Sequence, residues 1–187
     1  MKTFKIILII PLFILLLGSQ CRKDLKNTLP PITQIGAGTF GCLVDGQLYR
    51  DGNVSFYSPS LIIVLQPSKN NTLILDAMNN YGNSRKSVGF TINNMTSIGK
   101  YYLTGQNNGI FWDVNSNLNI TSFCKFQTDS LDQTGYVNIT YFDTIQKVVS
   151  GIFSFKAKLF QSSAGTCDST HIYNVTEGRF DASYTKR

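Results

Sequence analysis

Residues 136–159 read YVNITYFDTIQKVVSGIFSFKAKL, and this stretch decides the fold class. Apolar side chains alternate with polar ones on both sides of a turn at residues 143–146. The apolar positions are Val137, Ile139 and Tyr141 before the turn, and Phe153, Phe155, Ala157 and Leu159 after it. A period of two residues is typical of a strand with one face in a core and the other in water. The stretch therefore predicts a half-buried antiparallel β-hairpin.

Most of the remaining chain has the same character. Short apolar or alternating segments, separated by turn residues, predict further strands at residues 39–44, 47–50, 61–65, 73–75, 88–92, 101–104, 109–114, 119–126, 172–176 and 179–184. Asp45-Gly46 is a strong hairpin signal, and Gly178 is expected to form a bulge. No apolar period of 3.6 residues continues for three turns. We expect an all-β fold of about ten antiparallel strands, either a β-sandwich or a flattened barrel.

The first twenty-one residues have the layout of a secretory signal peptide. Lys2 and Lys5 precede an apolar run at residues 6–17, after which small residues lead to Cys21. This run is shorter than the roughly 20 apolar residues that a transmembrane helix needs. A cysteine at the cleavage position is typical of a bacterial lipoprotein, in which the sulfur carries the lipid. Because Gln20 is bulkier than the residue usually found there, ordinary secretion remains the alternative.

These features divide the chain into three parts. Residues 1–20 are the expected signal peptide, residues 21–38 a lipidated flexible tether, and residues 39–187 a single all-β domain. The membrane is therefore an expected partner, reached through the lipid anchor. The net charge is +6, but the basic residues are scattered and form no stripe with interleaved aromatic residues, so no nucleic-acid partner is expected.

The cysteines suggest at most one disulfide. With Cys21 lipidated, three cysteines remain, and a bacterial envelope permits a bridge between two of them. Cys42 lies in an apolar segment and is expected to be a small buried hydrophobic residue. Cys124 and Cys167 lie in more polar surroundings and are the candidate pair, although other pairings remain open. Without a CxxC motif or a Cys/His cluster, neither a metal site nor a cofactor is expected.

Four segments resemble an uncharacterised family of Bacteroidota lipoproteins: LPPITQIG at 29–36, TFGCLVDG at 39–46, SGIFSF at 150–155 and TEGRFD at 176–181. The resemblance implies lipidation of Cys21 and a place in the cell envelope at the outer membrane, on the periplasmic leaflet or the cell surface. It implies no catalytic residue, because that family has no known function.

Membership of that phylum would also imply sites of O-glycosylation. Its exported proteins carry such glycans at Asp-Ser or Asp-Thr followed by an aliphatic residue or threonine. The matching hydroxyl residues are Ser130, Thr144 and Ser169, each in a predicted turn.

Catalytic chemistry is not expected from this sequence. A glycosidase needs two carboxylates facing each other across a cleft, yet Glu177 is the single glutamate and most aspartates, such as Asp45, lie beside turn residues. A serine hydrolase needs a histidine base, and His171, the only histidine, is accompanied by no Gly-x-Ser-x-Gly motif. A glycan-active enzyme is the least favoured alternative.

A binding function is more consistent with the side chains present. Tyr101, Tyr102, Phe111 and Trp112 form the densest aromatic group in the middle of the chain. Such rings can stack on a glycan, or they can fill the core. A lipocalin-like barrel around a small apolar ligand is an alternative, as is contact with other envelope proteins. We therefore expect a non-enzymatic ligand-binding or protein-interaction module on an envelope-anchored lipoprotein.

Overall fold

The structure, a computed structural model, describes residues 28–52, 59–81, 84–117, 120–131, 134–163 and 167–187. The expected signal peptide (1–20), Cys21, the start of the tether and residue 119 lie outside the described residues. The described residues form strands β1 (Thr39–Val44), β2 (Gln47–Arg50), β3 (Leu61–Gln66), β4 (Thr72–Tyr81), β5 (Ser84–Ile92), β6 (Gly99–Tyr102), β7 (Asn108–Asn117), β8 (Ile120–Gln127), β9 (Tyr136–Asp143), β10 (Val148–Ser162), β11 (Ile172–Ser183) and β12 (Thr185–Lys186), with a short 3-10 helix, η2 (Pro67–Lys69). The all-β prediction is confirmed.

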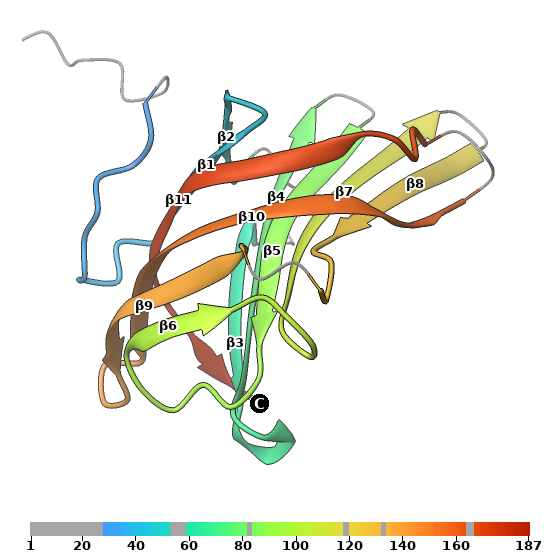
Figure 1. The fold of residues 1–187 in the computed structure, drawn as a ribbon. Coiled ribbons are helices and arrows are strands. Elements are labelled where there is room, and N and C mark those ends of the chain that lie inside the picture. The colour runs from blue at the N-terminus through green and yellow to red at the C-terminus, as the bar shows by residue number, and fades with distance from the viewer. Residues whose placement is uncertain (1–27, 53–58, 82–83, 118–119, 132–133, 164–166) are drawn as a thin grey trace, which may run out of the picture.

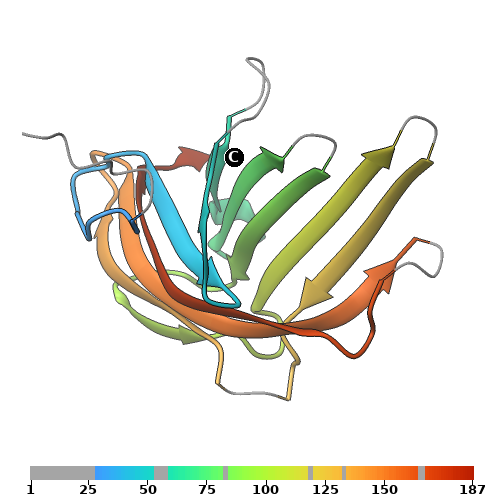
Figure 2. The same ribbon diagram turned by 90° about the horizontal axis from the view of Figure 1, so that it is seen from above.

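The strands form one sheet that curls into a half-barrel. Its order is β12-β3-β4-β5-β7-β8-β10-β11-β1-β2, and the pair β6-β9 branches from β10. Strand β10 makes this fork because its first half pairs with β9 and its last residues pair with β8. All neighbouring strands are antiparallel except β12, which is parallel to β3, so the sheet is mixed. Figure 1 labels the strands, and Figure 2 shows β10 and β11 along the base of the curl, with the β1–β2 hairpin and β7–β8 on opposite sides.

The β9–β10 hairpin confirms the period-two pattern over most of residues 136–159. Tyr141 was predicted to face the core, which was wrong: the strand register shifts between Ile139 and Tyr141, so Phe142 packs against the core instead. Asp143 pairs with Val148 at the turn, and Val137 pairs with Phe153 further along. The side chains of Val137, Ile139, Phe153, Phe155 and Ala157 are all buried. The intervening Lys156 and Lys158 are exposed, as an outward face requires. The alternation therefore determines which face of β10, the longest strand, is turned toward the core.

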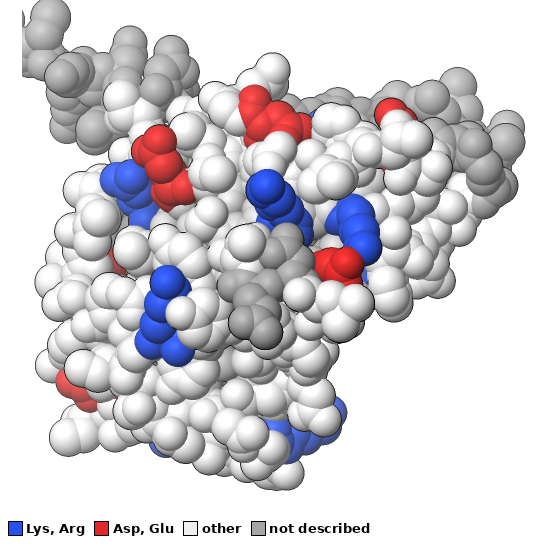
Figure 3. Space-filling view, in the orientation of Figure 1, with Lys and Arg blue, Asp and Glu red and all other residues white. Residues whose placement is uncertain are grey.

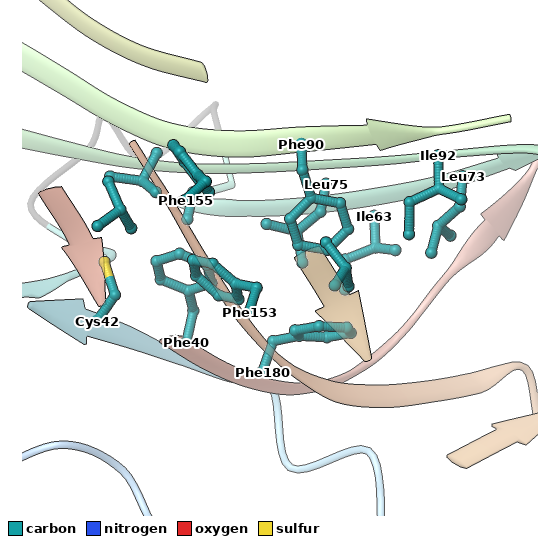
Figure 4. Packing of buried hydrophobic residues seen from close by; sticks show 14 of the residues in the cluster. Phe40, Cys42, Ile63, Leu73, Leu75, Phe90, Ile92, Phe153, Phe155 and Phe180 are labelled. Carbon is teal, nitrogen blue, oxygen red and sulfur yellow. The ribbon is translucent and has the colours of Figure 1, made fainter. Parts of the chain in front are cut away.

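Phenylalanine rings fill the interior of the half-barrel. The ring of Phe153 lies 5.4 Å from that of Phe40, 5.6 Å from Phe90, 6.1 Å from Phe155 and 6.4 Å from Phe180, measured between centroids. Figure 4 shows Phe40, Phe153 and Phe180 on one side of the core and Phe90 with Leu75 on the other. Burying each ring stabilises the fold by about 1.5–3 kcal/mol. These contacts hold the two walls of the curl together.

Two turn signals have the predicted geometry. Asp45 and Gly46 have φ angles of 50° and 78°, as a two-residue type I′ turn requires, and Val44 pairs with Gln47 across it. The bulge at Gly178 is also present, because the pairing of β10 with β11 shifts directly after Phe153 and Gly178. A Cβ atom on Gly178 would lie 2.5 Å from the ring of Phe153. The bulge makes residues 172–183 one bent strand instead of two.

The segment predicted to be a flexible tether is, from Pro30 onward, part of the domain, and that prediction was wrong there. Pro30 is buried, and its carbonyl oxygen accepts a hydrogen bond of 3.3 Å from Nη1 of Arg179. A Cβ atom on Gly41 of β1 would lie 2.5 Å from the ring of Pro30. In Figure 1 the segment, in blue, runs along the outside of the sheet before it enters β1.

The Asp181 carboxylate holds this segment in place. It accepts hydrogen bonds from Oγ1 of Thr33 (2.6 Å), from Oγ of Ser150 (2.7 Å) and from three backbone N–H groups, those of Ile35 (3.1 Å), Gly36 (2.8 Å) and Ala37 (3.2 Å). Burial alone would raise the pKa of Asp181, but these hydrogen bonds lower it to about 2. We call residues 30–37 with Asp181 the N-terminal clamp. The glycine and proline content suggested flexibility because the sequence does not reveal this distant acceptor.

Candidate functional site

A cleft of about 320 Å³ opens on the concave side of the half-barrel. One wall is the β1–β2 hairpin, and the other consists of side chains from β5, β7 and the beginning of β11. The lining residues are Val44, Asp45, Gln47, Leu48 and Tyr49 on the first wall, and Lys86, Phe111, His171 and Tyr173 on the second. We call this site the mouth cleft. Its volume is at the lower end of the range found for small-molecule sites.

Aromatic rings form the floor of the mouth cleft around Tyr173. The centroid of the Tyr173 ring lies 4.3 Å from that of Phe111, 4.6 Å from Phe126 and 4.3 Å from the imidazole of His171. Phe111 is 1% exposed, whereas Tyr173 is only partly buried. The floor is therefore anchored in the core, with Tyr173 at the boundary between core and cleft.

His171 and Asp45 form a hydrogen-bonded pair at the rim. Nε2 of His171 lies 2.9 Å from Oδ2 of Asp45, and the backbone N–H of Asn174 donates to Oδ1 of Asp45 at 2.8 Å. Burial alone would raise the pKa of Asp45, but the hydrogen bonds from Asn174 and His171 lower it. Asp45 therefore forms part of the hairpin turn, as predicted, and its carboxylate also orients the imidazole of His171. The sequence analysis missed this pair because 126 residues separate the two side chains.

An ion pair lies on the opposite wall. Nζ of Lys86 lies 3.6 Å from Oδ2 of Asp113, and Oγ of Ser84 donates to the same carboxylate at 3.0 Å. The Tyr49 hydroxyl group lies 2.8 Å from the carbonyl oxygen of Ala77 and 2.9 Å from that of Lys86, and this contact joins the hairpin to β4 and β5. The two walls are therefore held at a fixed separation.

Tyr173 faces the carboxylates of both walls. Burial raises the pKa of the Tyr173 hydroxyl, and the nearby charges of Asp113, Asp45 and Asp168 raise it further. The hydroxyl group therefore stays protonated at neutral pH and can donate a hydrogen bond. The cleft thus presents a protonated phenol beside the His171–Asp45 hydrogen bond and the Lys86–Asp113 ion pair.

The structure does not bring together the four aromatic residues that the sequence analysis grouped as a binding site. Phe111 and Trp112 are neighbours on β7, so their side chains point to opposite faces of the sheet. Tyr101 and Tyr102 lie on β6, which pairs with β9 and not with β7. Tyr101 packs against the core, and Tyr102 is 51% exposed. Only Phe111 contributes to the mouth cleft.

Trp112 lies instead beside a shallow depression on the outer, convex face. This depression has a volume of about 140 Å³ and lies where Gly89, in the middle of β5, has no side chain. Asp76 and Thr91 supply its polar groups, and Ile74, Ile110 and Trp112 its apolar ones. We call it the outer trough. Burial raises the pKa of Asp76, although a hydrogen bond from Ser87 opposes this effect.

The three candidate sites of O-glycosylation lie on exposed turns. Ser130, Thr144 and Ser169 each follow an aspartate whose Oδ1 accepts a backbone N–H two residues further along the chain. All three hydroxyl residues are exposed. Their accessibility is compatible with modification, which stays a prediction.

A disulfide joins Cys124 to Cys167, the pair favoured by the sequence analysis, and Cys42 is a buried free thiol. The bridge connects β8 with the segment that leads to His171. Burial raises the pKa of the Cys42 thiol, so it stays protonated. Within the described ranges, no three side chains of His, Cys, Asp or Glu lie close enough to share a metal ion.

Charges on the surface are dispersed. Figure 3 shows lysine and arginine side chains as separate patches on the face that it presents, with acidic groups beside several of them. No helix in the part of the chain that the structure describes is long and apolar enough to span a membrane. Comparison with known proteins adds no identification, because no family model, no curated protein and no solved structure matches this chain.

Proposed function

We propose that this chain is an envelope-anchored lipoprotein whose domain binds a small, neutral, mainly apolar ligand in the mouth cleft without transforming it. The observation that carries this proposal is the composition of the cleft, with an aromatic floor around Tyr173 and a rim of polar groups. Ligand sites commonly combine an apolar lining with a few convergent polar groups. Because the strands and the Tyr49 contact fix both walls, the site is formed before a ligand arrives.

The filled core supports a ligand at the mouth instead of one deep inside. A lipocalin-like carrier holds its ligand within the barrel, but here that position is filled by Phe153, whose ring contacts those of Phe40 and Phe90. Protein interiors are close-packed, so a ligand could enter only by displacing these rings. The mouth cleft is where the aromatic interior meets solvent.

The pairing of charges supports a neutral ligand. Lys86 is bound to Asp113, and Asp45 is held by His171 and by the backbone N–H of Asn174, so the ammonium group and both carboxylates of the rim already have partners. A charged ligand would have to displace one of these partners and lose water as well. A ring or short chain with one or two hydrogen-bonding groups would not incur this cost.

Binding is favoured over catalysis by what surrounds His171. The pair with Asp45 orients the imidazole as a general base would be oriented. Among the described residues, however, no serine, threonine or cysteine side chain hydrogen bonds to that imidazole. We therefore assign the His171–Asp45 pair a structural role, which is to hold the rim of the cleft in place.

The proposed anchor is the lipid on Cys21. The signal-like layout of residues 1–21 supports it, as does the N-terminal clamp, which holds the chain from Pro30 onward against the domain. The residues from Arg22 to Leu29 can span at most about 28 Å when fully extended. The anchor would thus hold the domain close to the membrane.

Native mass spectrometry of the full chain, extracted in detergent from its native envelope, tests the proposal. We expect a small-molecule adduct on the wild type. Gln47→Trp should abolish the adduct because the indole would fill the cleft from its exposed rim. Gln146→Trp, the same change on an exposed turn away from the cleft, should leave it intact. A wild type without any adduct, or an adduct that survives Gln47→Trp, would contradict the proposal.

A further inference from the structure

A group of aromatic side chains and one lysine lies on the outer face of the sheet, away from the mouth cleft. Trp112 and Lys125 pair across β7 and β8, and their neighbours Phe111 and Phe126 point into the core. Trp112 and Lys125 therefore point outward. Phe123 of β8 and Phe160 of β10 complete the group. We call these four residues the outer platform.

The lysine lies between two rings of this platform. Nζ of Lys125 lies 5.4 Å from the centroid of Trp112 and 5.0 Å from that of Phe160. An ammonium group over an aromatic face is held by the ring quadrupole. No carboxylate of the described residues lies within ion-pair distance of Lys125, in contrast to Lys86 and Lys158. The platform thus carries a positive charge without an anionic partner.

The rings of the platform are partly exposed on the outer face of the sheet. The centroids of Trp112 and Phe123 lie 5.8 Å apart, with 35° between the ring planes. Phe160 is 62% exposed, so most of its apolar ring faces solvent. Lys125 and the exposed Lys156 place positive charge on two neighbouring strands, whereas Lys158 is paired with Asp129. An occupant therefore needs flat apolar faces together with negative groups.

The outer trough extends the platform with hydrogen-bonding groups. It begins at Trp112 and contains the carboxyl group of Asp76 and the hydroxyl group of Thr91. Because Gly89 has no side chain, the backbone forms the bottom of the trough. Hydroxyl groups of a ligand stacked on Trp112 could donate to Asp76 and exchange hydrogen bonds with Thr91.

We infer that the outer platform and outer trough bind an acidic polysaccharide. Sugar rings present apolar C–H faces that stack on aromatic rings, and their hydroxyl groups hydrogen bond to carboxylates. The carboxylate of an acidic sugar would supply the anionic partner that Lys125 lacks. This site lies on the opposite face of the sheet from the mouth cleft, so it does not depend on the proposed function.

Isothermal titration of the full chain in detergent with oligogalacturonate tests this inference. We expect the wild type to bind, and Trp112→Ala and Lys125→Gln each to weaken binding by about tenfold or more, which corresponds to about 1.4 kcal/mol. The matched control is Lys100→Gln on β6. Lys100 also lies over aromatic rings, 5.2 Å from Tyr102 and 4.1 Å from Tyr136, so this variant removes the same charge and the same type of contact elsewhere. It should bind like the wild type.

Several outcomes would overturn the inference. Absence of oligogalacturonate binding would do so, as would an equal loss in Lys100→Gln, which would indicate attraction by net charge alone. Equal binding of neutral dextran oligosaccharides would remove the role given to Lys125. Tighter binding of single-stranded DNA or of anionic lipid vesicles would assign the platform to another class of partner. If Trp112→Ala lowers the melting temperature, its weaker binding could reflect unfolding, and Lys125→Gln then decides the test.

Discussion

Replacing Asp181 by asparagine should destabilise the domain strongly, although the two side chains have nearly the same shape. Asp181 is 1% exposed and accepts five hydrogen bonds from the N-terminal clamp and Ser150. Three of them reach Oδ2, from Thr33 and the N–H groups of Ile35 and Ala37. An asparagine can keep these three if its oxygen takes the Oδ2 position. Its NH2 group then faces the N–H of Gly36, and two donors meet.

The expected loss follows from two contributions. The pKa of Asp181 falls from 3.8 to about 2 on folding, which corresponds to about 2 kcal/mol of stability from the charged form. The partly buried N–H of Gly36, left without an acceptor, adds about 1–3 kcal/mol. We therefore expect Asp181→Asn to lower the free energy of unfolding by about 3–5 kcal/mol at neutral pH.

Urea unfolding of the wild type and Asp181→Asn at a series of pH values measures this loss. Because folding lowers the pKa, the stability due to charge is fully present above the unfolded pKa of about 4 and is lost as the pH falls toward 2. The difference between the two proteins should shrink over that window. Asp168→Asn, a change at an exposed turn carboxylate, is the control and should have little effect. A loss below about 1 kcal/mol, or one independent of pH, would refute the role assigned to the clamp.

Three further predictions concern the core and the cysteines. Phe153→Ala should lower the free energy of unfolding by about 3–5 kcal/mol in urea titrations, since its ring contacts four others; a loss under 1 kcal/mol would contradict the packing. Gly178→Ala should cost about 1–3 kcal/mol in the same assay, because its Cβ would overlap the Phe153 ring, and a neutral result would place the bulge elsewhere. A thiol reagent should modify Cys42 only after unfolding, whereas Cys124 and Cys167 should react only after reduction; mass spectrometry of labelled peptides would detect any other order.

The local elements could be predicted because their signals are short-range. Asp45-Gly46 lies between two strand-like segments, where an Asp-Gly pair is a strong signal for a two-residue hairpin turn. The alternation around Phe153 and Phe155 fixes one face of β10. The ends of the strands depend on partners that are distant in the sequence. Residues 73–75 were predicted as a strand because they are apolar, but β4 continues to Tyr81 since its partner β5 supplies hydrogen bonds to polar residues as well.

The sites could not be predicted because each depends on contacts between residues that are far apart in the sequence. His171 meets Asp45 only because β1 lies beside β11, and Asp181 meets residues 33–37 for the same reason. The predicted aromatic group failed for a local reason, since adjacent residues of a strand face opposite sides. Applying that rule to Phe111 and Trp112 would have separated the two faces from sequence alone.

Photo-crosslinking in the native host tests the central claim, ligand binding in the mouth cleft, most directly. A benzophenone amino acid would replace Gln47 at the rim of the cleft or, as a control, Gln146 on an exposed turn. After irradiation, the mass of the purified protein would be measured by mass spectrometry. The account predicts a covalent adduct of small-molecule mass at position 47 and none at position 146. A crosslink from position 47 to another protein, or no crosslink there at all, would contradict it.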